Sequence, residues 1–139
     1  MTQWLASVTL LVRDYEEAIT HYTKSLGFTL VENTVLTDGK RWIRVAPPGS
    51  SGVTLLLARA STPAQVARIG DQTGGRVFLF LRTSDFWRDH QAMRSRGVHF
   101  VEEPRVESYG TVAVFQDLYG NRWDLVQPTS PAESRLSSG

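Results

Sequence analysis

The sequence predicts an α+β fold in which one βαβββ module occurs twice within a single domain. The apolar run from Val8 to Arg13 returns 69 positions later as the run from Val77 to Arg82. Each run leads into a segment whose apolar residues recur at helical spacing, and that segment ends at a glycine, Gly27 in the first copy and Gly97 in the second. Three further β-like runs follow each glycine. A supersecondary unit repeated at a nearly constant offset is typical of a duplicated fold.

The helix of the first module is marked at both ends. Asp14 is its expected N-cap, and Glu17 follows three residues later, which is the spacing of a capping box. Tyr22 and Leu26 lie on one face at helical spacing, directly before the glycine that permits a left-handed C-terminal cap. The β-like runs that follow are Phe28 to Glu32, Trp42 to Ala46 and Val53 to Ala58.

The second module repeats this order. Ser84 or Thr83 is the expected N-cap of its helix, and Phe86, His90 and Met93 share one helical face. The tight-turn sequence Gly-Asn separates the last two runs of the module. These later runs are Val98 to Glu102, Thr111 to Gln116 and Arg122 to Gln127.

A linker joins the modules and a polar tail ends the chain. The linker contains Thr62 to Ala67, which has the composition of a short helix with proline in its first turn. Serine, proline and glycine dominate the tail, so we expect it to be flexible. The expected boundaries are 1–128 for the domain, about 5–60 for module one, 61–75 for the linker, about 76–128 for module two and 129–139 for the tail.

The composition limits the classes of function. The 139 residues carry a net charge of +1, and the basic residues are spread along the chain rather than clustered, which argues against a nucleic-acid-binding face. There are no cysteines, so disulfides, zinc–thiolate sites and thiol nucleophiles are excluded. Neither a signal peptide nor an apolar run of about 20 residues is present, so we expect a cytoplasmic protein that does not bind membranes.

Two motifs within the duplicated framework resemble those of a known superfamily. The opening motif is Val8 to Asp14 followed by Leu26-Gly27-Phe28, and the closing motif is Tyr109-Gly110 followed by Asp117 to Leu125. Together they resemble the glyoxalase/bleomycin-resistance/dioxygenase (vicinal oxygen chelate) superfamily over roughly Leu5 to Pro128. The resemblance implies a curved mixed sheet that forms a cup, with the helices outside and the active cavity inside. It also implies a homodimer that takes a small-molecule ligand.

The metalloenzymes of that superfamily bind a divalent ion through four side chains, two from each module. Carried over to this chain, the four positions fall on Ser7, Leu55, Arg76 and Asp124. Leu55 has no donor atom, and the permanent positive charge of Arg76 repels a cation. The resemblance therefore predicts no metal cofactor, although a divalent metal bound in another way stays open. His21, His90 and His99 share no ligand spacing, and each is expected to pack or to face solvent.

Strand alternation predicts which side chains line the cup. Residues on the face of Asp124 are expected to point inward, and the other face, with Leu10 and Trp123 among its members, is expected to pack under the helices. Arg76 and Asp124 either contact a ligand or neutralise each other. Trp42, Arg44 and Tyr109 are candidates for the rim, and Trp42 is alternatively a residue of the core or of the dimer interface. The full set of expected ligand-binding residues is Ser7, Thr9, Trp42, Arg44, Leu55, Phe78, Phe80, Tyr109 and Arg122.

Two functions follow from this interpretation. The first is a metal-free binding protein, similar to the bleomycin-resistance branch, that holds a small amphipathic or aromatic molecule in a largely apolar cup. The second is a glyoxalase-like lyase or isomerase, or a dioxygenase-like metalloenzyme, with Asp124 and Arg76 as catalytic residues. Asp124 acts as a general base if burial raises its pKa, whereas a nearby Arg76 opposes that change.

Overall fold

The computed structural model describes residues 1–129, and the part of the predicted tail from 130 to 139 lies outside them. The chain divides into two compact units, and the division between Gln72 and Thr73 falls inside the predicted linker. Each unit is a mixed β-sheet with helices, so the predicted α+β fold class is confirmed. Within residues 1–129, no helix is both long and apolar enough to cross a membrane.

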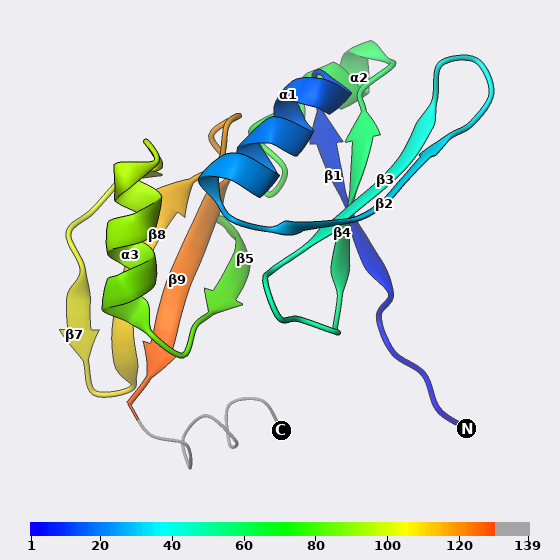
Figure 1. The fold of residues 1–139 in the computed structure, drawn as a ribbon. Coiled ribbons are helices and arrows are strands. Elements are labelled where there is room, and N and C mark those ends of the chain that lie inside the picture. The colour runs from blue at the N-terminus through cyan, green and yellow to red at the C-terminus, as the bar shows by residue number, and fades with distance from the viewer. Residues whose placement is uncertain (130–139) are drawn as a thin grey trace. The chain divides into compact units, whose positions relative to one another are not determined.

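The first unit is a four-stranded sheet with α1 lying across one face (Figure 1). The strand order is β1-β4-β3-β2, in which β1 and β4 run parallel and the other neighbours run antiparallel. The elements are β1 (Ser7–Val12), α1 (Tyr15–Thr20), the π-helical turn η1 (His21–Ser25), β2 (Thr29–Val35), β3 (Arg41–Ala46), β4 (Thr54–Arg59) and α2 (Pro63–Val66).

The helix ends of the first unit follow the local sequence. The Asp14 carboxylate accepts a hydrogen bond of 2.9 Å from the backbone N–H of Glu17, which confirms Asp14 as the N-cap. Gly27 has a φ of 77°, the left-handed conformation expected at the end of this helix. The short helix predicted in the linker is present as α2, and the Thr62 hydroxyl caps it by accepting a hydrogen bond from the backbone N–H of Gln65.

The sheet of the first unit has a helix-covered face and a helix-free face. On the helix-covered face, Leu10 of β1 lies beside Leu57 of β4, and both side chains are fully buried. On the helix-free face, Thr9 lies beside Leu56. The helix-covered face is thus the core of the unit, and the helix-free face is available for other contacts.

The predicted orientation of Leu55 is wrong. Leu55 pairs with Val8 rather than with Ser7, so it lies on the helix-covered face and is buried there. A register slip of one residue moves every side chain of a strand to the opposite face. Burial of alternate leucines against the helix sets this register, and it leaves Thr54 and Leu56 on the face of Ser7.

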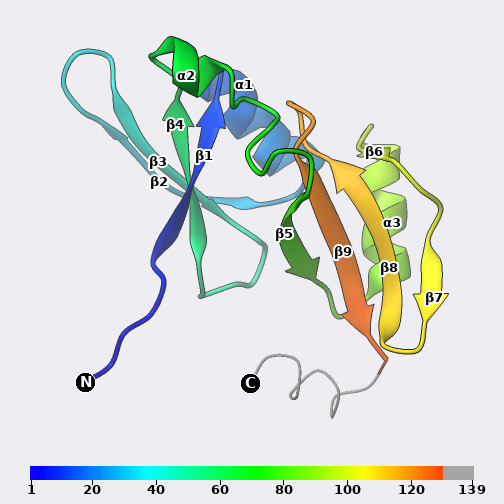
Figure 2. The ribbon, with the colours of Figure 1, turned by 180° about the vertical axis from the view of Figure 1, so that it is seen from behind.

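The second unit repeats the arrangement, with β5 parallel to β9 and α3 packed behind the sheet (Figure 2). The sheet order is β5-β9-β8-β6, and an additional strand, β7, pairs with β8. The expected strand at Val98 to Glu102 is shorter in the structure, and β7 was not expected. The elements are β5 (Val77–Arg82), α3 (Phe86–Ser95), β6 (His99–Phe100), β7 (Arg105–Glu107), β8 (Gly110–Gln116) and β9 (Arg122–Pro128).

The expected cap of the second helix is also wrong. Asp85, and neither Ser84 nor Thr83, is the N-cap of α3, because its carboxylate accepts from the backbone N–H of Arg88. The Thr83 hydroxyl instead contacts the carboxylate of Asp89. Any of these polar residues can cap a helix, so the local sequence alone does not decide which one starts it.

A continuous row of rings forms the core of the second unit. His90 of α3 lies 4.4 Å from Phe100 between ring centroids, Phe100 lies 5.6 Å from Phe115, and Phe115 stacks on Trp123 at 5.9 Å. His90 is buried, which confirms its predicted packing role. Trp123 lies on the helix-covered face of this sheet, also as predicted.

We expect Gly110→Ala to destabilise the second unit. A Cβ atom at Gly110 would lie 2.4 Å from the backbone oxygen of Gln127, a contact that the paired strands cannot relieve without moving apart. The free energy of unfolding should fall by about 2 to 3 kcal/mol, measured by urea denaturation. Gly52→Ala is the matched control, because a Cβ there meets only a side-chain oxygen at 3.8 Å. Equal stability of the two variants would contradict the steric argument.

Candidate functional site

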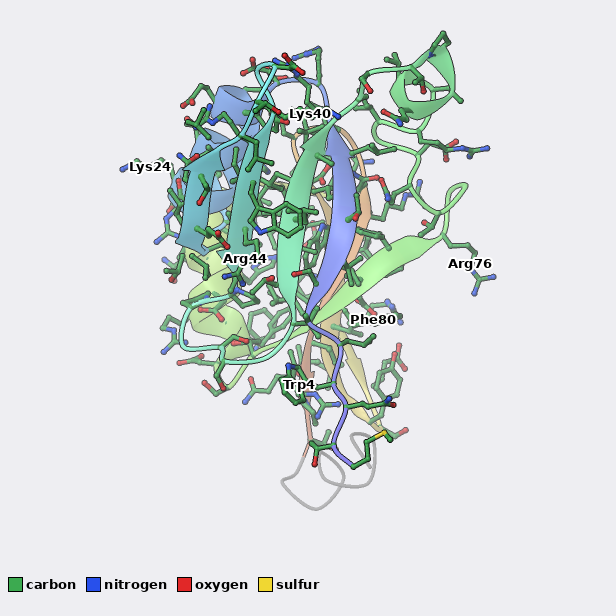
Figure 3. The ribbon with its side chains drawn as sticks, turned by 90° about the vertical axis from the view of Figure 1, so that its right-hand side faces the viewer. Trp4, Lys24, Lys40, Arg44, Arg76 and Phe80 are labelled. Atoms are coloured by element: carbon green, nitrogen blue, oxygen red, sulfur yellow. The ribbon has the colours of Figure 1, made fainter. Side chains whose placement is uncertain are left out.

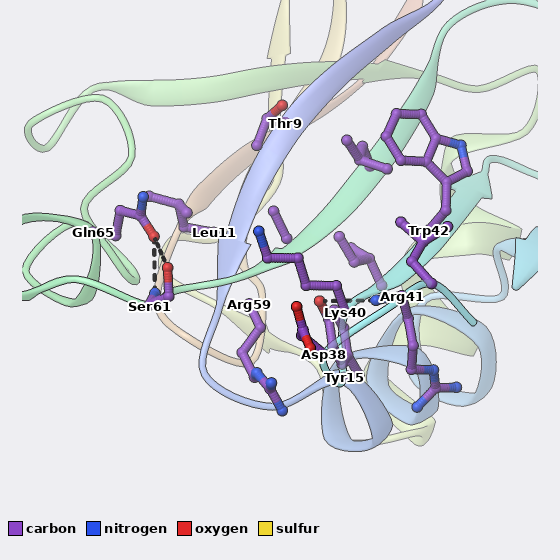
Figure 4. Close-up of a pocket in the computed structure, with 14 residues that line it drawn as sticks. Thr9, Leu11, Tyr15, Asp38, Lys40, Arg41, Trp42, Arg59, Ser61 and Gln65 are labelled. Carbon is purple, nitrogen blue, oxygen red and sulfur yellow. Dashed lines mark hydrogen bonds between the residues drawn. The ribbon is translucent and has the colours of Figure 1, made fainter. Parts of the chain in front are cut away.

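A cavity of about 480 Å³ lies in the first unit, bordered by the helix-free face of its sheet (Figure 4). We call it the module-one pocket. Its floor is apolar, with Leu11 from β1 and Leu56 and Ala58 from β4. Its size falls in the range of about 300 to 1,000 Å³ that is usual for small-molecule sites. The remaining lining residues are Thr9, Tyr15, Leu36, Asp38, Lys40, Arg41, Trp42, Leu57, Arg59, Ser61 and Gln65.

A tight turn between β2 and β3 brings one side of this pocket into place. Asp38 and Gly39 have φ angles of 58° and 75°, and both values are positive as a type I′ turn requires. The turn is closed by hydrogen bonds from Leu36 N–H to the Lys40 carbonyl at 2.8 Å and from Lys40 N–H to the Thr37 carbonyl at 3.1 Å. Asp-Gly favours this turn because both residues tolerate a positive φ. The turn therefore sets where Lys40 enters β3.

Strand alternation after the turn directs two large side chains to the same face. Lys40 and Trp42 are two residues apart, and both line the pocket. Trp42 is 41% exposed, so part of this residue is accessible to a bound molecule. Arg44, the next residue in this alternation, lies beside Leu56 on the same face.

Tyr15 organises the basic end of the pocket. The guanidinium carbons of Arg41 and Arg59 lie 5.4 and 5.1 Å from the centre of its ring. Its hydroxyl accepts a hydrogen bond of 3.3 Å from the backbone N–H of Arg41. The Arg41 side chain also forms an ion pair with Glu16. The Arg59 guanidinium lies close to the turn, since a Cβ built on Gly39 would be 3.6 Å from its Nη2 atom.

A row of polar side chains crosses the same sheet beside the pocket. The hydroxyls of Ser7 and Thr54 are 2.8 Å apart, and Arg44 reaches Thr54 at 3.5 Å. Arg44 also donates to Glu32 at 2.8 Å. The hydrogen bond from Arg44 has the largest effect on Glu32 and lowers its pKa. Burial opposes this change by raising the pKa, and a hydrogen bond from Thr34 lowers it by a smaller amount. Arg44 is therefore held by protein groups, and the row orders the strands at this end of the sheet.

In the second unit, Asp124 is the predicted site residue with the most unusual surroundings. It lies beside Phe80 of β5 and Val114 of β8 on the helix-free face. Its Oδ1 atom is buried and makes no hydrogen bond within residues 1–129. Burial raises the pKa of Asp124 to about 6, while the positive charge of Arg105 opposes this rise and the negative charge of Glu102 adds to it.

The other predicted residues of the second unit do not gather around Asp124. Arg76 is exposed just before β5 and extends outward (Figure 3). No ion pair found in the described part of the chain includes it. The positive charge that acts on the pKa of Asp124 is that of Arg105 instead. The Phe78 ring meets Trp123 edge-on at 6.1 Å, at an irregularity of β5. Phe80, Arg122 and Tyr109 are exposed.

The structure brings some of the predicted residues together and adds others. Thr9 and Trp42 line one pocket, Ser7 and Arg44 share one polar row, and Phe80 lies beside Asp124. The sequence interpretation missed the basic end of the pocket, which is formed by Tyr15, Lys40, Arg41 and Arg59. The signal that would have found Lys40 is the Asp38-Gly39 dipeptide between two β-like runs.

The described residues do not form the usual ligand set of a divalent metal. Within residues 1–129, no group of three or more histidine, aspartate or glutamate side chains is arranged to hold an ion. In the observed register, the β4 residues on the helix-free face are Thr54, Leu56 and Ala58, and Leu55 is not among them. None of these three side chains is a usual ligand of a divalent ion. The Ser7 hydroxyl is engaged by Thr54.

Paired βαβββ modules, each with a parallel first and last strand, define the class of this protein. The model of the Glyoxalase/Bleomycin resistance protein/Dioxygenase superfamily matches residues 4–125, and the chain belongs to that superfamily. It is similar to an uncharacterized protein of Shewanella frigidimarina, with 56% identity over 128 residues that cover 91% of this chain and 95% of the relative.

Solved structures show the same fold. The chain is similar to UcmS2, with a TM-score of 0.79, 28% identity, and coverage of 91% of this chain and 98% of the other. It is also similar to TnmS3, an antibiotic binding protein from Streptomyces sp. CB03234. That comparison has a TM-score of 0.74 and 30% identity, and it covers 92% of this chain and 98% of TnmS3.

We expect Asp124→Asn to change how stability depends on pH. The pKa of the Asp124 carboxyl rises from its ordinary value of 3.8 to about 6 in the fold. Between these two pH values the folded state therefore binds more protons than the unfolded state. Wild-type stability should therefore decrease as pH rises through this window. Above about pH 6, the variant should be more stable than the wild type by about 1 kcal/mol, a value reduced for the partial exposure of the group.

Thermal unfolding between about pH 4 and 8 measures this difference. The advantage of the variant should shrink toward the acidic end, where the wild-type carboxyl is protonated. Asp71→Asn, which changes an exposed aspartate, is the matched control. An advantage that does not vary with pH would contradict the assignment.

Proposed function

We propose that this protein binds a flat, largely apolar small molecule in the module-one pocket and needs no metal to do so. The observation that carries the proposal is the pocket itself, with its apolar floor and the accessible indole of Trp42 at one side. Aromatic side chains bind flat ligands by stacking, and apolar surface removed from water supplies most of the affinity. A few polar groups at the edge then orient the ligand.

The similarity to TnmS3 supports this function. TnmS3 is described as an antibiotic binding protein, and it is 30% identical to this chain over nearly the full length of both. Superfamily membership by itself does not decide between binding and catalysis, because one fold carries many functions. The proposal therefore depends on the pocket, and the relative adds the class of ligand, an organic molecule of antibiotic size.

The donor chemistry supports binding without a metal. The positions that correspond to the metalloenzyme ligands offer one carboxylate, Asp124, together with Ser7 and the cationic Arg76. A site for a divalent ion requires several neutral or anionic donors. We therefore propose that the ligand is held by side chains alone. A location in the cytoplasm stays a prediction.

The proposal is tested by titration with phenylnaphthylamine, a neutral aromatic dye whose fluorescence rises in apolar surroundings. We expect saturable binding that is unchanged after dialysis against EDTA and after addition of Ni²⁺ or Zn²⁺. Trp42→Ala should weaken binding about tenfold, because the stacking surface is lost. Trp87→Ala, which removes an exposed tryptophan of α3, is the matched control and should have no effect.

Two results would count against this function. If the dye does not bind, or if Trp42→Ala binds as the wild type does, the module-one pocket is not the ligand site. If binding requires added metal, the metal-free mechanism is wrong.

We also propose that the chain forms a homodimer. Trp4, Leu5 and Phe80 are large apolar residues with exposed fractions of 78%, 73% and 70%. Exposed apolar residues of this size are common where a second chain binds. Light scattering coupled to size-exclusion chromatography should give twice the mass of one chain, and a Trp4→Ser, Phe80→Ser double variant should shift that mass toward the monomer. A monomeric wild type would refute the proposal.

A second candidate function is that of a lyase or isomerase in which Asp124 is the base. One observation favours it, the buried Oδ1 atom of a carboxyl whose pKa lies near 6. Turnover of the adduct of methylglyoxal and glutathione, lost in Asp124→Asn, would favour this candidate. The absence of such turnover in a preparation that binds the dye would favour binding alone.

A further inference from the structure

We propose that the module-one pocket selects aromatic molecules that carry an acidic group, with Lys40 and Arg59 as the side chains that hold the negative charge. The inference rests on the proposed binding function, and it names the chemical class of the ligand. Neither residue belongs to the positions at which the superfamily's metalloenzymes bind their ion.

The two cations and the stacking surface lie at separate places around one cavity. Trp42 and Arg59 lie on opposite sides of the pocket, and the Lys40 side chain extends into the space between them (Figure 4). Arg59 stays near the turn that carries Lys40, since its Nη2 atom would lie 3.6 Å from a Cβ on Gly39. A flat ligand stacked on Trp42 therefore extends toward positive charge at its far end.

The partners of the basic residues show which charges are available. Arg41 is engaged by Glu16 and by Asn33, so its charge is already balanced. Among the ion pairs found in residues 1–129, none includes Lys40 or Arg59. The Arg59 guanidinium lies over the Tyr15 ring, and a ring contact leaves its N–H groups able to donate hydrogen bonds.

The charge balance of the lining favours an anion. With Arg41 paired, the lining carries two positive charges, from Lys40 and Arg59, and one negative charge, from Asp38. The charges of these three residues therefore sum to one positive charge. The planar guanidinium of Arg59 can donate two parallel hydrogen bonds to a carboxylate or sulfonate, and the Lys40 ammonium can donate a third.

The experiment compares two dyes with the same rings and different charge. Anilinonaphthalenesulfonate carries a sulfonate, and phenylnaphthylamine is the same ring system without it. We expect Lys40→Met and Arg59→Gln each to weaken binding of the sulfonate about tenfold, because a charge-assisted hydrogen bond is lost. Both variants should bind the neutral dye within about twofold of the wild type, since stacking is retained. Calorimetry measures the affinities.

Matched controls exist for both cations. Lys24 is the other lysine of the chain, and Figure 3 places it on the helix side, away from Lys40. Lys24→Met should leave both affinities unchanged. Arg96→Gln, which removes an exposed arginine at the end of α3, serves the same purpose for Arg59. Circular dichroism and thermal unfolding confirm that each variant is folded.

A gain of affinity provides an independent readout. Asp38→Asn keeps a residue that tolerates the positive φ of this position and removes the carboxylate that repels an anion. It should tighten binding of the sulfonate about threefold and leave the neutral dye unchanged. A variant that is merely damaged would not bind one dye more tightly.

The outcomes separate this inference from the proposed function. If both dyes bind, Trp42→Ala weakens both, and the charge variants change neither, the binding function holds and the selection of acids is wrong. If Lys24→Met weakens the sulfonate as much as Lys40→Met, the effect is one of overall charge, and the inference is also wrong. If neither dye binds the wild type, both proposals are overturned.

Discussion

The parallel pairing of the first and last strands in each module positions the rest of the structure. β1 lies beside β4 and β5 lies beside β9, and parallel neighbours cannot be joined by a tight turn. The chain between them must therefore cross one face of the sheet, and a helix makes this crossing in both modules. The helix buries the side chains of that face. The register of the parallel pair then decides which residues remain on the other face, where the pocket of the first unit lies.

The β2–β3 hairpin supplies pocket residues that the parallel pair of β1 and β4 does not contain. Its two strands pair from Thr29 to Ala46, and the Asp38-Gly39 turn closes them. Figure 1 shows this hairpin reaching past the ends of the other strands of its sheet. The Gly39 position of the turn thereby lies close to the side chain of Arg59, the last residue of β4. Two segments separated by about twenty residues in the chain form one end of the pocket.

Binding and catalysis make different demands on the two units. The first unit has an apolar floor, a stacking surface and two cations that form no ion pair within residues 1–129, which suit the retention of a ligand. The second unit has one carboxyl whose ionisation is opposed by burial, and such a group is more typical of proton transfer than of tight binding. Both features lie on the same type of βαβββ module, so a few side chains on a common framework decide which chemistry each unit offers.

The sequence by itself determined the order of the elements, the duplication and most helix ends. These features depend on local spacing. Asp14 caps the helix of module one, and a glycine with a positive φ follows the main helix of each module. The tertiary structure decided which face Leu55 occupies, that Asp85 caps α3, and that Tyr15, Lys40 and Arg59 meet at one pocket. It also decided that Arg105 rather than Arg76 acts on Asp124. Strand register and contacts between distant segments depend on which side chains are buried together, and that packing cannot be read from local spacing.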